Sequence, residues 1–356
     1  MKREDVFSVV LLPGDGIGPE VTRSAVRVLE ASINETGGFR LEFDELSVGA
    51  GEFLKNGDPL PKSALAACAA ADGVLLGAMG LPSVRWPDGR ELTPQIDLRE
   101  QLDLYGGLRP VYLYHEQDTP LKGIKAGGID LLLVRENTEG LFAARHDSRT
   151  SDDCVTDTMK ITRKGAERIC RLAFDEAMKR RKYVTLIDKA NVLPSMVYLR
   201  EVFDEVAKDY PEVRTDRYYV DAMSLYLVQD PCRFDVMVTE NMFGDIISDL
   251  IAGLVGGMGF APSGDLGQDC AVFQPSHGTA PDIAGQGIAN PIATILSAAM
   301  MLDWFDTASS KAAAASIKNA VKEVLSDPAV RTRELGGTCS TDEITDRIIQ
   351  CLSNHS

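Results

Sequence analysis

The chain has 356 residues, of which 44% are hydrophobic and 25% are charged, a composition that excludes fibrous and largely disordered proteins. This length exceeds one compact core, so we expect one large or two medium α/β domains. A formal net charge of −16 disfavours binding to nucleic acid and to anionic membranes, and it means that an anionic substrate would need a local basic pocket.

Targeting, membrane and disulfide signals are weak or missing in the sequence. The first apolar run, Val6–Leu12, has the length of a strand and not of a secretory signal. The longest apolar stretches, Leu250–Pro262 and Pro291–Phe305, contain glycines or Asp303 and are too short to span a bilayer. Seven cysteines without a C-x-x-C pair argue against a disulfide framework or a structural zinc site. We therefore expect a cytoplasmic protein with buried thiols.

Short apolar runs alternate with helical patterns along the chain. Val6–Leu12 is followed by a glycine turn and by an amphipathic helix that begins near Pro19. A helix is predicted at Ala166–Lys179, and further buried strands are predicted at Val74–Gly77, Ile129–Val134, Tyr183–Ile187 and Phe234–Val238. This alternation predicts an α/β fold with largely parallel sheets, in which ligands bind at the carboxyl ends of strands.

The turn that joins the first strand to the first helix is rich in glycine. Its residues, Gly14-Asp15-Gly16-Ile17-Gly18-Pro19, do not match the G-x-G-x-x-G spacing of a dinucleotide fingerprint. No acidic residue stands at the offset that such a fingerprint requires, and the chain has no G-K-[ST] phosphate loop. The segment is therefore interpreted as a tight structural turn in preference to a Rossmann site.

Three arginines are candidates for anion binding: Arg99 and Arg109 in LREQLDLYGGLRP, and Arg135 at the end of a predicted strand. Guanidinium groups bind carboxylates through paired hydrogen bonds, and an acidic protein that handles a polyanion needs such a cluster. Spacing alone does not show that the three converge, so surface salt bridges are the alternative.

Acidic residues and one lysine follow other strands. Asp245 and Asp249 stand four apart, so on a helix they share one face, and their oxygens suit Mg²⁺ or Mn²⁺. Asp221 also follows a strand-like stretch and could supply a third oxygen. Lys189 follows the strand that ends at Ile187, and a lysine partly desolvated near a cation is a candidate general base. A solvated acidic face and a solvated loop lysine are the alternatives.

A long loop of small residues begins at His277 and Gly278. Such a loop lets backbone approach a ligand closely, His277 can stack on or bond to adenine, and Asp282 could accept both hydroxyls of an adenosine ribose. Asn290 and the proline after it predict the N-cap and first turn of a buried helix over Ile292–Met301. An ordinary surface loop is the alternative.

Taken together, these segments resemble one family. LLPGDGIGPEV, LREQLDLYGGLRP, VRENTEG, IDKANVL, FDVMVTENMFGDIISD and HGTAPDIAGQGIANP occur in family order over about residues 8–303. They are similar to motifs of the β-decarboxylating dehydrogenases, which act on isopropylmalate, isocitrate, homoisocitrate, tartrate or D-malate. The resemblance implies a non-Rossmann, two-domain isopropylmalate dehydrogenase-like fold with a cleft between the domains. Residues 1–103 and 256–356 would form a large cofactor domain, and 104–255 a small central domain with substrate, metal and dimer contacts.

The resemblance also implies a homodimer in which each active site is completed by the partner subunit. Arg99, Arg109 and Arg135 would clamp the substrate carboxylates, while Asp245 and Asp249, with Asp221 of either subunit, would hold Mg²⁺ or Mn²⁺. Lys189 from the partner would take the hydroxyl proton as hydride passes to the nicotinamide. The metal would lower the hydroxyl pKa and stabilise the enolate that decarboxylation forms.

The same resemblance assigns the cofactor. His277, Gly278, Asp282, Ile283 and Asn290 would contact it. Asp282 and Ile283 stand where NADP-using relatives carry a Lys-Tyr pair, so NAD is expected because a carboxylate would repel the 2′-phosphate.

Three residues depart from the family pattern. Phe142 replaces the tyrosine that protonates the enolate, so water or another group substitutes, the reaction stops at an earlier product, or the chain is a non-catalytic subunit of a hetero-oligomer. Gln274 replaces a glutamate near the nicotinamide. Gln95 replaces the leucine that meets the isopropyl group, four positions before Arg99. 3-Isopropylmalate is the leading expected substrate, and D-malate or tartrate, favoured by Gln95, is the alternative.

Overall fold

The computed structural model describes residues 5–354, which divide into two compact units. The first unit comprises the described parts of Met1–Leu102, Gly256–Gly264 and Gln268–Ser356. The second comprises Asp103–Val255 and Asp265–Gly267. Within residues 5–354, no helix is long and apolar enough to cross a membrane.

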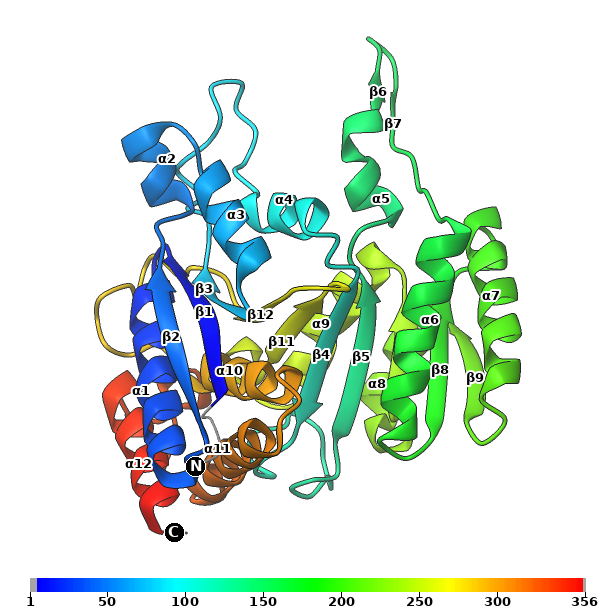
Figure 1. Ribbon diagram of the computed structural model, residues 1–356. Helices are drawn as coiled ribbons and strands as arrows, with labels where there is room; N and C mark the ends of the chain where they lie inside the picture. Colours follow the sequence, from blue (N-terminus) through cyan, green and yellow to red (C-terminus); the bar gives the residue numbers. More distant parts are fainter. Residues whose placement is uncertain (1–4, 355–356) are drawn as a thin grey trace. The chain divides into compact units, whose positions relative to one another are not determined.

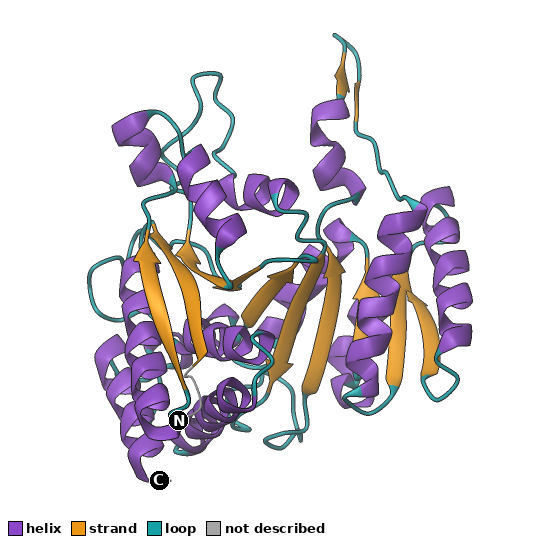
Figure 2. Ribbon diagram, in the orientation of Figure 1, coloured by secondary structure: helices purple, strands orange, loops and turns teal. Residues whose placement is uncertain are grey.

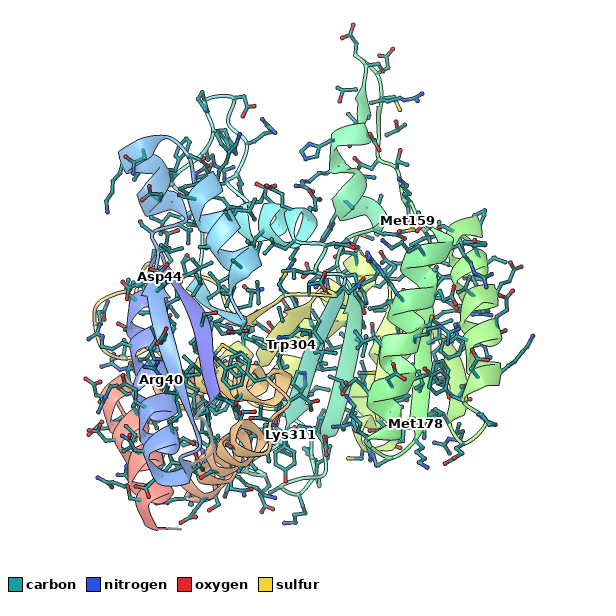
Figure 3. The ribbon with its side chains drawn as sticks, in the orientation of Figure 1. Arg40, Asp44, Met159, Met178, Trp304 and Lys311 are labelled. Carbon is teal, nitrogen blue, oxygen red and sulfur yellow. The ribbon has the colours of Figure 1, made fainter. Side chains whose placement is uncertain are left out.

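The first unit is built on strands in the order β2-β1-β3-β12-β11, and the last two residues of β11, Asp265 and Leu266, belong to the second unit (Figure 1). Strand β1 runs parallel to both β2 and β3, and β12 runs parallel to β3. Strand β2 lies at the edge, and its exposed side chains include Arg40 and Asp44 (Figure 3), charges that discourage pairing with another chain. The strands are β1 (Asp5–Gly14), β2 (Phe39–Glu45), β3 (Gly73–Ala78), β11 (Pro262–Leu266) and β12 (Ala271–Pro275).

Helices cover the strands of the first unit. α1 packs against α10, α11 and α12, and its apolar side chains Val21, Ala25 and Leu29 are fully buried. α10 is buried along most of its length, as its almost unbroken apolar sequence predicts. The helices are α1 (Gly18–Thr36), α2 (Ala50–Asn56), α3 (Lys62–Ala70), α4 (Pro94–Gln101), α10 (Ile292–Trp304), α11 (Ala308–Ser326) and α12 (Thr341–Asn354).

The second unit has five strands in the order β4-β5-β10-β8-β9. β5, β10, β8 and β9 are parallel neighbours, whereas β4 is antiparallel to β5. The carboxyl ends of four strands therefore lie at one edge, where the loops that carry polar side chains begin. The strands are β4 (Gly106–Tyr112), β5 (Asp130–Glu136), β8 (Tyr183–Asp188), β9 (Arg214–Tyr219) and β10 (Val236–Thr239).

Helices cover both faces of the second unit's strands, and a hydrophobic core lies between the strands and the helices on each face (Figure 2). One face packs on Phe174 of α6 (Arg163–Met178) and Phe203 of α7 (Pro194–Val206). The other packs on helices α8 (Val220–Gln229) and α9 (Asn241–Gly253). A short helix, α5 (Gly140–Ala143), precedes a hairpin of β6 (Arg149–Thr150) and β7 (Val155–Thr156).

The predicted alternation of strands and helices is confirmed, with boundaries shifted by a few residues. The five predicted strands correspond to β1, β3, β5, β8 and β10, and the predicted helix at Ala166–Lys179 corresponds to α6. Two expectations are wrong. Asn290 is not the N-cap of α10, because Pro291 occupies that position, although the Asn290 side chain still accepts a hydrogen bond from the Ile292 N–H at 3.0 Å. Nor are all seven cysteines buried, since Cys154 is exposed at the turn of the β6–β7 hairpin.

Candidate active site

Two buried arginines face the same side of the second unit's strands. Arg135 on β5 lies opposite Gly107, and Arg109 on β4 lies opposite Leu133. Residues two apart on a strand point the same way, so both guanidinium groups are on one face. They are only 4% and 5% exposed, which requires that their charges be compensated.

Each arginine is held by a specific acceptor. Arg135 forms an ion pair with Asp245 and donates to Asn241 Oδ1 from Nε and Nη2, at 3.1 and 2.8 Å. Arg109 donates from Nη2 to Asp265 Oδ1 at 2.8 Å, and Asn137 donates to the same oxygen at 2.9 Å. These contacts fix both guanidinium groups within the protein.

The α9 helix presents the acidic pair that the sequence predicts. Asp245 and Asp249 occupy successive turns of one helical face, and both are exposed. Partial desolvation of the carboxyl group and the neighbouring Asp245 carboxylate raise the pKa of Asp249, while the guanidinium groups of Arg135 and Arg109 oppose that rise. A divalent cation would relieve the repulsion between the two carboxylates, and Mg²⁺ commonly binds one or two carboxylates while keeping water or substrate oxygens as its other ligands. The pair therefore fits such an ion.

Asp221 does not join this acidic pair in the single chain. Its Oδ1 accepts a hydrogen bond from Lys189 Nζ at 2.6 Å, and that contact lowers the pKa of Asp221. Across residues 5–354, no three His, Cys, Asp or Glu side chains form a cluster that could hold a metal ion. The structure thus brings Lys189 and Asp221 together as one pair and Asp245 and Asp249 together as another.

Phe142 lies beside the arginine cluster. It is on α5, and the Arg135 guanidinium carbon is 5.6 Å from the centre of its ring. Asn241 also donates to the Glu139 carbonyl at 3.0 Å, which ties the segment before α5 to α9. The residue that departs from the family pattern therefore lies next to a proposed substrate ligand.

Three contributors to this cluster were missed by the sequence analysis. Asn241 lies four residues before Asp245, so the same helical periodicity could have revealed it. A side chain at Gly244 would come within 2.6 Å of Arg135 Cγ, so glycine is needed for α9 to approach β5. Asp265 had no local signal, because its partner Arg109 is 156 residues away.

Gln95 and Arg99 belong to the first unit. They lie four residues apart on α4, so they share one face of that helix. The Gln95 side-chain oxygen is buried and has no hydrogen-bond partner among the described residues. An unpaired buried amide oxygen is costly, so this atom is suited to accept a hydrogen bond from a ligand.

The loop from His277 to Asn290 also belongs to the first unit. Burial lowers the pKa of His277, so its imidazole is neutral at pH 7. His277 Nδ1 is 2.9 Å from the Gly278 carbonyl, whereas Nε2 is buried with no partner within the described chain. The Asp282 side chain is exposed. A loop that carries a buried acceptor nitrogen at one position and an exposed carboxylate at another has groups of the kinds that bind a base and ribose hydroxyls.

Packing fixes the rest of this loop. Ile283 packs with Ile17 and Val21 of the first turn and helix, so its side chain serves as an anchor. Asn290 donates to Glu334 at 2.7 Å. At the glycine turn, a side chain on Gly16 would meet the Thr279 carbonyl at 2.0 Å, which explains why that turn requires glycine there.

Comparison with known proteins decides the family. The sequence profile described as isocitrate/isopropylmalate dehydrogenase matches residues 8–348. The chain belongs to this family. It is 44% identical to the 3-isopropylmalate dehydrogenase of Mannheimia succiniciproducens, covering 90% of this chain and 92% of that protein. It is 41% identical to the 3-isopropylmalate dehydrogenase of Moorella thermoacetica, covering 97% and 99%.

Solved structures of the family have the same fold. The isocitrate dehydrogenase from Methylococcus capsulatus has a TM-score of 0.87 and 38% identity, covering 97% of this chain and 99% of that one. A β-decarboxylating dehydrogenase from Thermococcus kodakarensis has a TM-score of 0.82 and 35% identity, covering 98% and 96%. The resemblance and the α/β, non-Rossmann fold class are confirmed, and the chain is a decarboxylating dehydrogenase.

Proposed function

We propose that this dehydrogenase oxidises and decarboxylates 3-isopropylmalate in the cytoplasm, with NAD as the oxidant and Mg²⁺ or Mn²⁺ as the metal. The observation that carries the proposal is the cluster of Arg109, Arg135, Asp245 and Asp249 on one face of the second unit. It combines fixed cations for substrate carboxylates with carboxylates for a divalent ion. The names of the relatives at 39–44% identity support the choice of substrate.

Substrate binding is assigned to the arginines and Gln95. Arg109 and Arg135 would each use guanidinium N–H groups to bind a carboxylate, and their existing ion pairs hold them in place. Arg99, which lies on α4, would bind a second carboxylate of the substrate. Gln95, one helical turn away on the same helix, would face the substituent at C3 of the substrate.

Metal binding is assigned to Asp245 and Asp249, with Asp221 as the third carboxylate. When bound, the cation supplies Lewis-acid polarisation of the substrate hydroxyl and carbonyl oxygens. Asp245 would hold both the cation and Arg135, so the substrate carboxylate and the metal would be aligned by the same side chain.

Proton transfer is assigned to Lys189, with Asp221 as its partner. Lys189 Nζ would accept the proton of the 2-hydroxyl, and Asp221 would orient the amine through the contact of 2.6 Å. Phe142 has no proton to donate, so the carbon that loses its carboxylate must take its proton from water or from another group.

Cofactor binding is assigned to the loop from His277 to Asn290. When bound, NAD supplies the acceptor for the hydride. His277 Nε2, which is buried and has no hydrogen-bond partner among residues 5–354, would face the adenine, and Asp282 would accept from the ribose hydroxyls. Gly278 would let the backbone approach, while Ile283 and Asn290 hold the loop in shape.

A homodimer with shared sites accounts for the separation of Asp221 from Asp245. Leu225 and Val228 on α8 and Ile246 on α9 are exposed apolar side chains, 54%, 47% and 57% exposed, on the two helices that carry these aspartates. Contact between the α8 and α9 helices of two subunits would bury them and bring Asp221 and Lys189 of one subunit to Asp245 of the other. At a metal concentration that saturates the parent enzyme but not Asp249→Asn, co-expression of Lys189→Met and Asp249→Asn chains should then give more activity than either homodimer.

The substrate assignment is tested with a panel of 2-hydroxy acids. Purified enzyme is supplied with NAD, Mg²⁺ and 3-isopropylmalate, D-malate, tartrate or isocitrate, and NADH and CO₂ are measured in parallel. The proposal requires the highest kcat/KM with 3-isopropylmalate. A higher value with D-malate or tartrate would replace the substrate and keep the reaction, whereas no NADH with any acid would reject the catalytic role.

A further inference from the structure

The residue directly before Lys189, the lysine to which proton transfer is assigned, forms an ion pair with Arg200. Asp188, the last residue of β8, is fully buried, and both its oxygens accept hydrogen bonds from Arg200 of α7. Arg200 Nη2 donates to Oδ1 and Nε donates to Oδ2, each at 2.7 Å. Asp188 Oδ1 also accepts from the Ala190 N–H at 3.0 Å. The carboxylate thus fixes the backbone on both sides of Lys189.

The Arg200 guanidinium and the Lys189 amine both lie near the same aromatic ring, that of Tyr219. Tyr219, at the end of β9, is the register partner of Asp188. The Arg200 guanidinium carbon lies 5.5 Å from the centre of the Tyr219 ring, and Lys189 Nζ lies 5.8 Å from it. The Asp188 contact raises the pKa of Arg200, so the guanidinium stays charged.

From these contacts we propose that Asp188 and Arg200 are positioning residues that hold Lys189 at its working place, an inference that rests on the proposed role of Lys189. A lysine side chain has four flexible carbon–carbon bonds, so its amine is held in place only if its backbone and neighbours are fixed. Asp188 fixes the backbone, Arg200 fixes Asp188, and Tyr219 and Asp221 limit where the amine can lie.

The chain offers a matched control at the opposite ends of the same strands. Asp235, just before β10, is 1% exposed, accepts from Arg180 Nε at 2.8 Å and accepts from the Arg181 N–H at 2.9 Å. This pair repeats the chemistry of Asp188 and Arg200, a buried carboxylate bound by a guanidinium and a backbone N–H. It lies before the strands begin and not at the edge where Lys189 stands.

The experiment compares Arg200→Lys and Arg200→Met with Arg180→Lys and Arg180→Met in the full-length enzyme. Because displacing a reacting group by about 1 Å costs on the order of 10²-fold, we expect Arg200→Met to lower kcat by about 100-fold. Arg200→Lys keeps the charge but not the fork, so it should lower kcat by about 10-fold and recover part of the loss. KM for substrate and for NAD should change by less than about threefold, because Lys189 acts on the reacting hydroxyl and not on binding.

The control variants should lower the melting temperature but leave kcat within about twofold of the parent enzyme, because Arg180 has no contact with Lys189. If Arg200→Met does not fold, Arg200→Lys alone decides the result. An unchanged kcat in the Arg200 variants, or equal losses in the Arg200 and Arg180 variants, overturns the positioning role. Lys189→Met is measured alongside: if it keeps full kcat, the proposed function of Lys189 fails, whereas loss of activity there with normal Arg200 variants rejects only the positioning inference.

Discussion

Two groups of polar side chains differ in how their buried atoms are paired before any ligand binds. One is the α9 cluster of the second unit, which comprises Arg109, Arg135, Asp245 and Asp249, and the other is the cofactor loop of the first unit, from His277 to Asn290. In the α9 cluster, each buried charge already has a partner: Arg135 has Asp245, and Arg109 has Asp265. In the loop, His277 Nε2 is buried with no partner within the described chain, and Asp282 is open to solvent.

The difference follows from the energies of the groups involved. A buried unpaired guanidinium would cost several kcal/mol or more, so the arginines must be compensated before any ligand binds. A neutral ring nitrogen left unpaired costs only about 1–3 kcal/mol, so a loop can leave it unsatisfied until a ligand arrives. The charged cluster is therefore preorganised, while the loop contributes groups whose partners come with the ligand.

The largest effect is expected from removal of divalent cations, which tests the metal-binding role of the α9 cluster. Asp245 and Asp249 are the carboxylates of the preorganised cluster that face outward. Treatment with EDTA should abolish NADH formation, and Mg²⁺ or Mn²⁺ should restore it. Asp249→Asn should raise the metal concentration needed for half-maximal rate, whereas Asp230→Asn, at an exposed carboxylate after α8, should not. Full activity of thoroughly chelated enzyme would remove the metal assignment.

The preference for NAD over NADP tests the role of the cofactor loop, where Asp282 is exposed. With Asp282 exposed in the loop, kcat/KM with NAD should exceed that with NADP by on the order of 100-fold, about 3 kcal/mol, because the carboxylate repels a 2′-phosphate. Asp282→Asn should reduce this ratio, and Asp269→Asn, an exposed carboxylate elsewhere in the first unit, should leave it unchanged. Equal efficiencies with the two cofactors in the parent enzyme would refute the role of Asp282.

Phe142 tests whether the preorganised cluster lacks a proton donor. Its ring lies beside Arg135, so Phe142→Tyr adds a hydroxyl close to the proposed substrate site. General acid catalysis typically accelerates the assisted step by about 10²–10⁴-fold, so a limiting protonation should give a steady-state rate about tenfold higher or a higher CO₂ to NADH ratio. Phe142→Leu, which adds no donor, is the control. A ratio of one in both enzymes with no gain in rate would mean that water already delivers the proton.

An effect of similar size is expected at Gln95, where the side-chain oxygen has no hydrogen-bond partner among the described residues. Gln95→Leu removes the buried, unpartnered oxygen and should raise kcat/KM for 3-isopropylmalate by about tenfold, since an apolar substituent cannot pair with an amide. Gln101→Leu, exposed at the end of the same helix, should have no effect. A loss of activity with 3-isopropylmalate in Gln95→Leu would show that the amide binds this substrate directly.

Several features follow from the sequence alone because they depend on neighbours in the chain. The spacing of Asp245 and Asp249 predicts a shared helical face, and both lie on α9. Lys189 comes directly after the end of β8, and Asp221 comes two positions after the end of β9, so both follow strands as predicted. The glycine spacing at the first turn excluded a dinucleotide fingerprint, and the ordered motifs indicated the family that the comparisons confirm. Periodicity and motif order are local properties, so they can be read without the fold.

Only the tertiary structure decided which charges meet. Arg135 and Asp245 are 110 residues apart, and Arg109 and Asp265 are 156 apart, so no local pattern pairs them. Spacing also could not show that Asp221 pairs with Lys189 and not with the two aspartates of α9. Nor could it show that Arg200 donates to both carboxylate oxygens of Asp188, the residue before that lysine. Buried charges select their partners through strand order and helix packing, and those long-range contacts form only when the chain has folded.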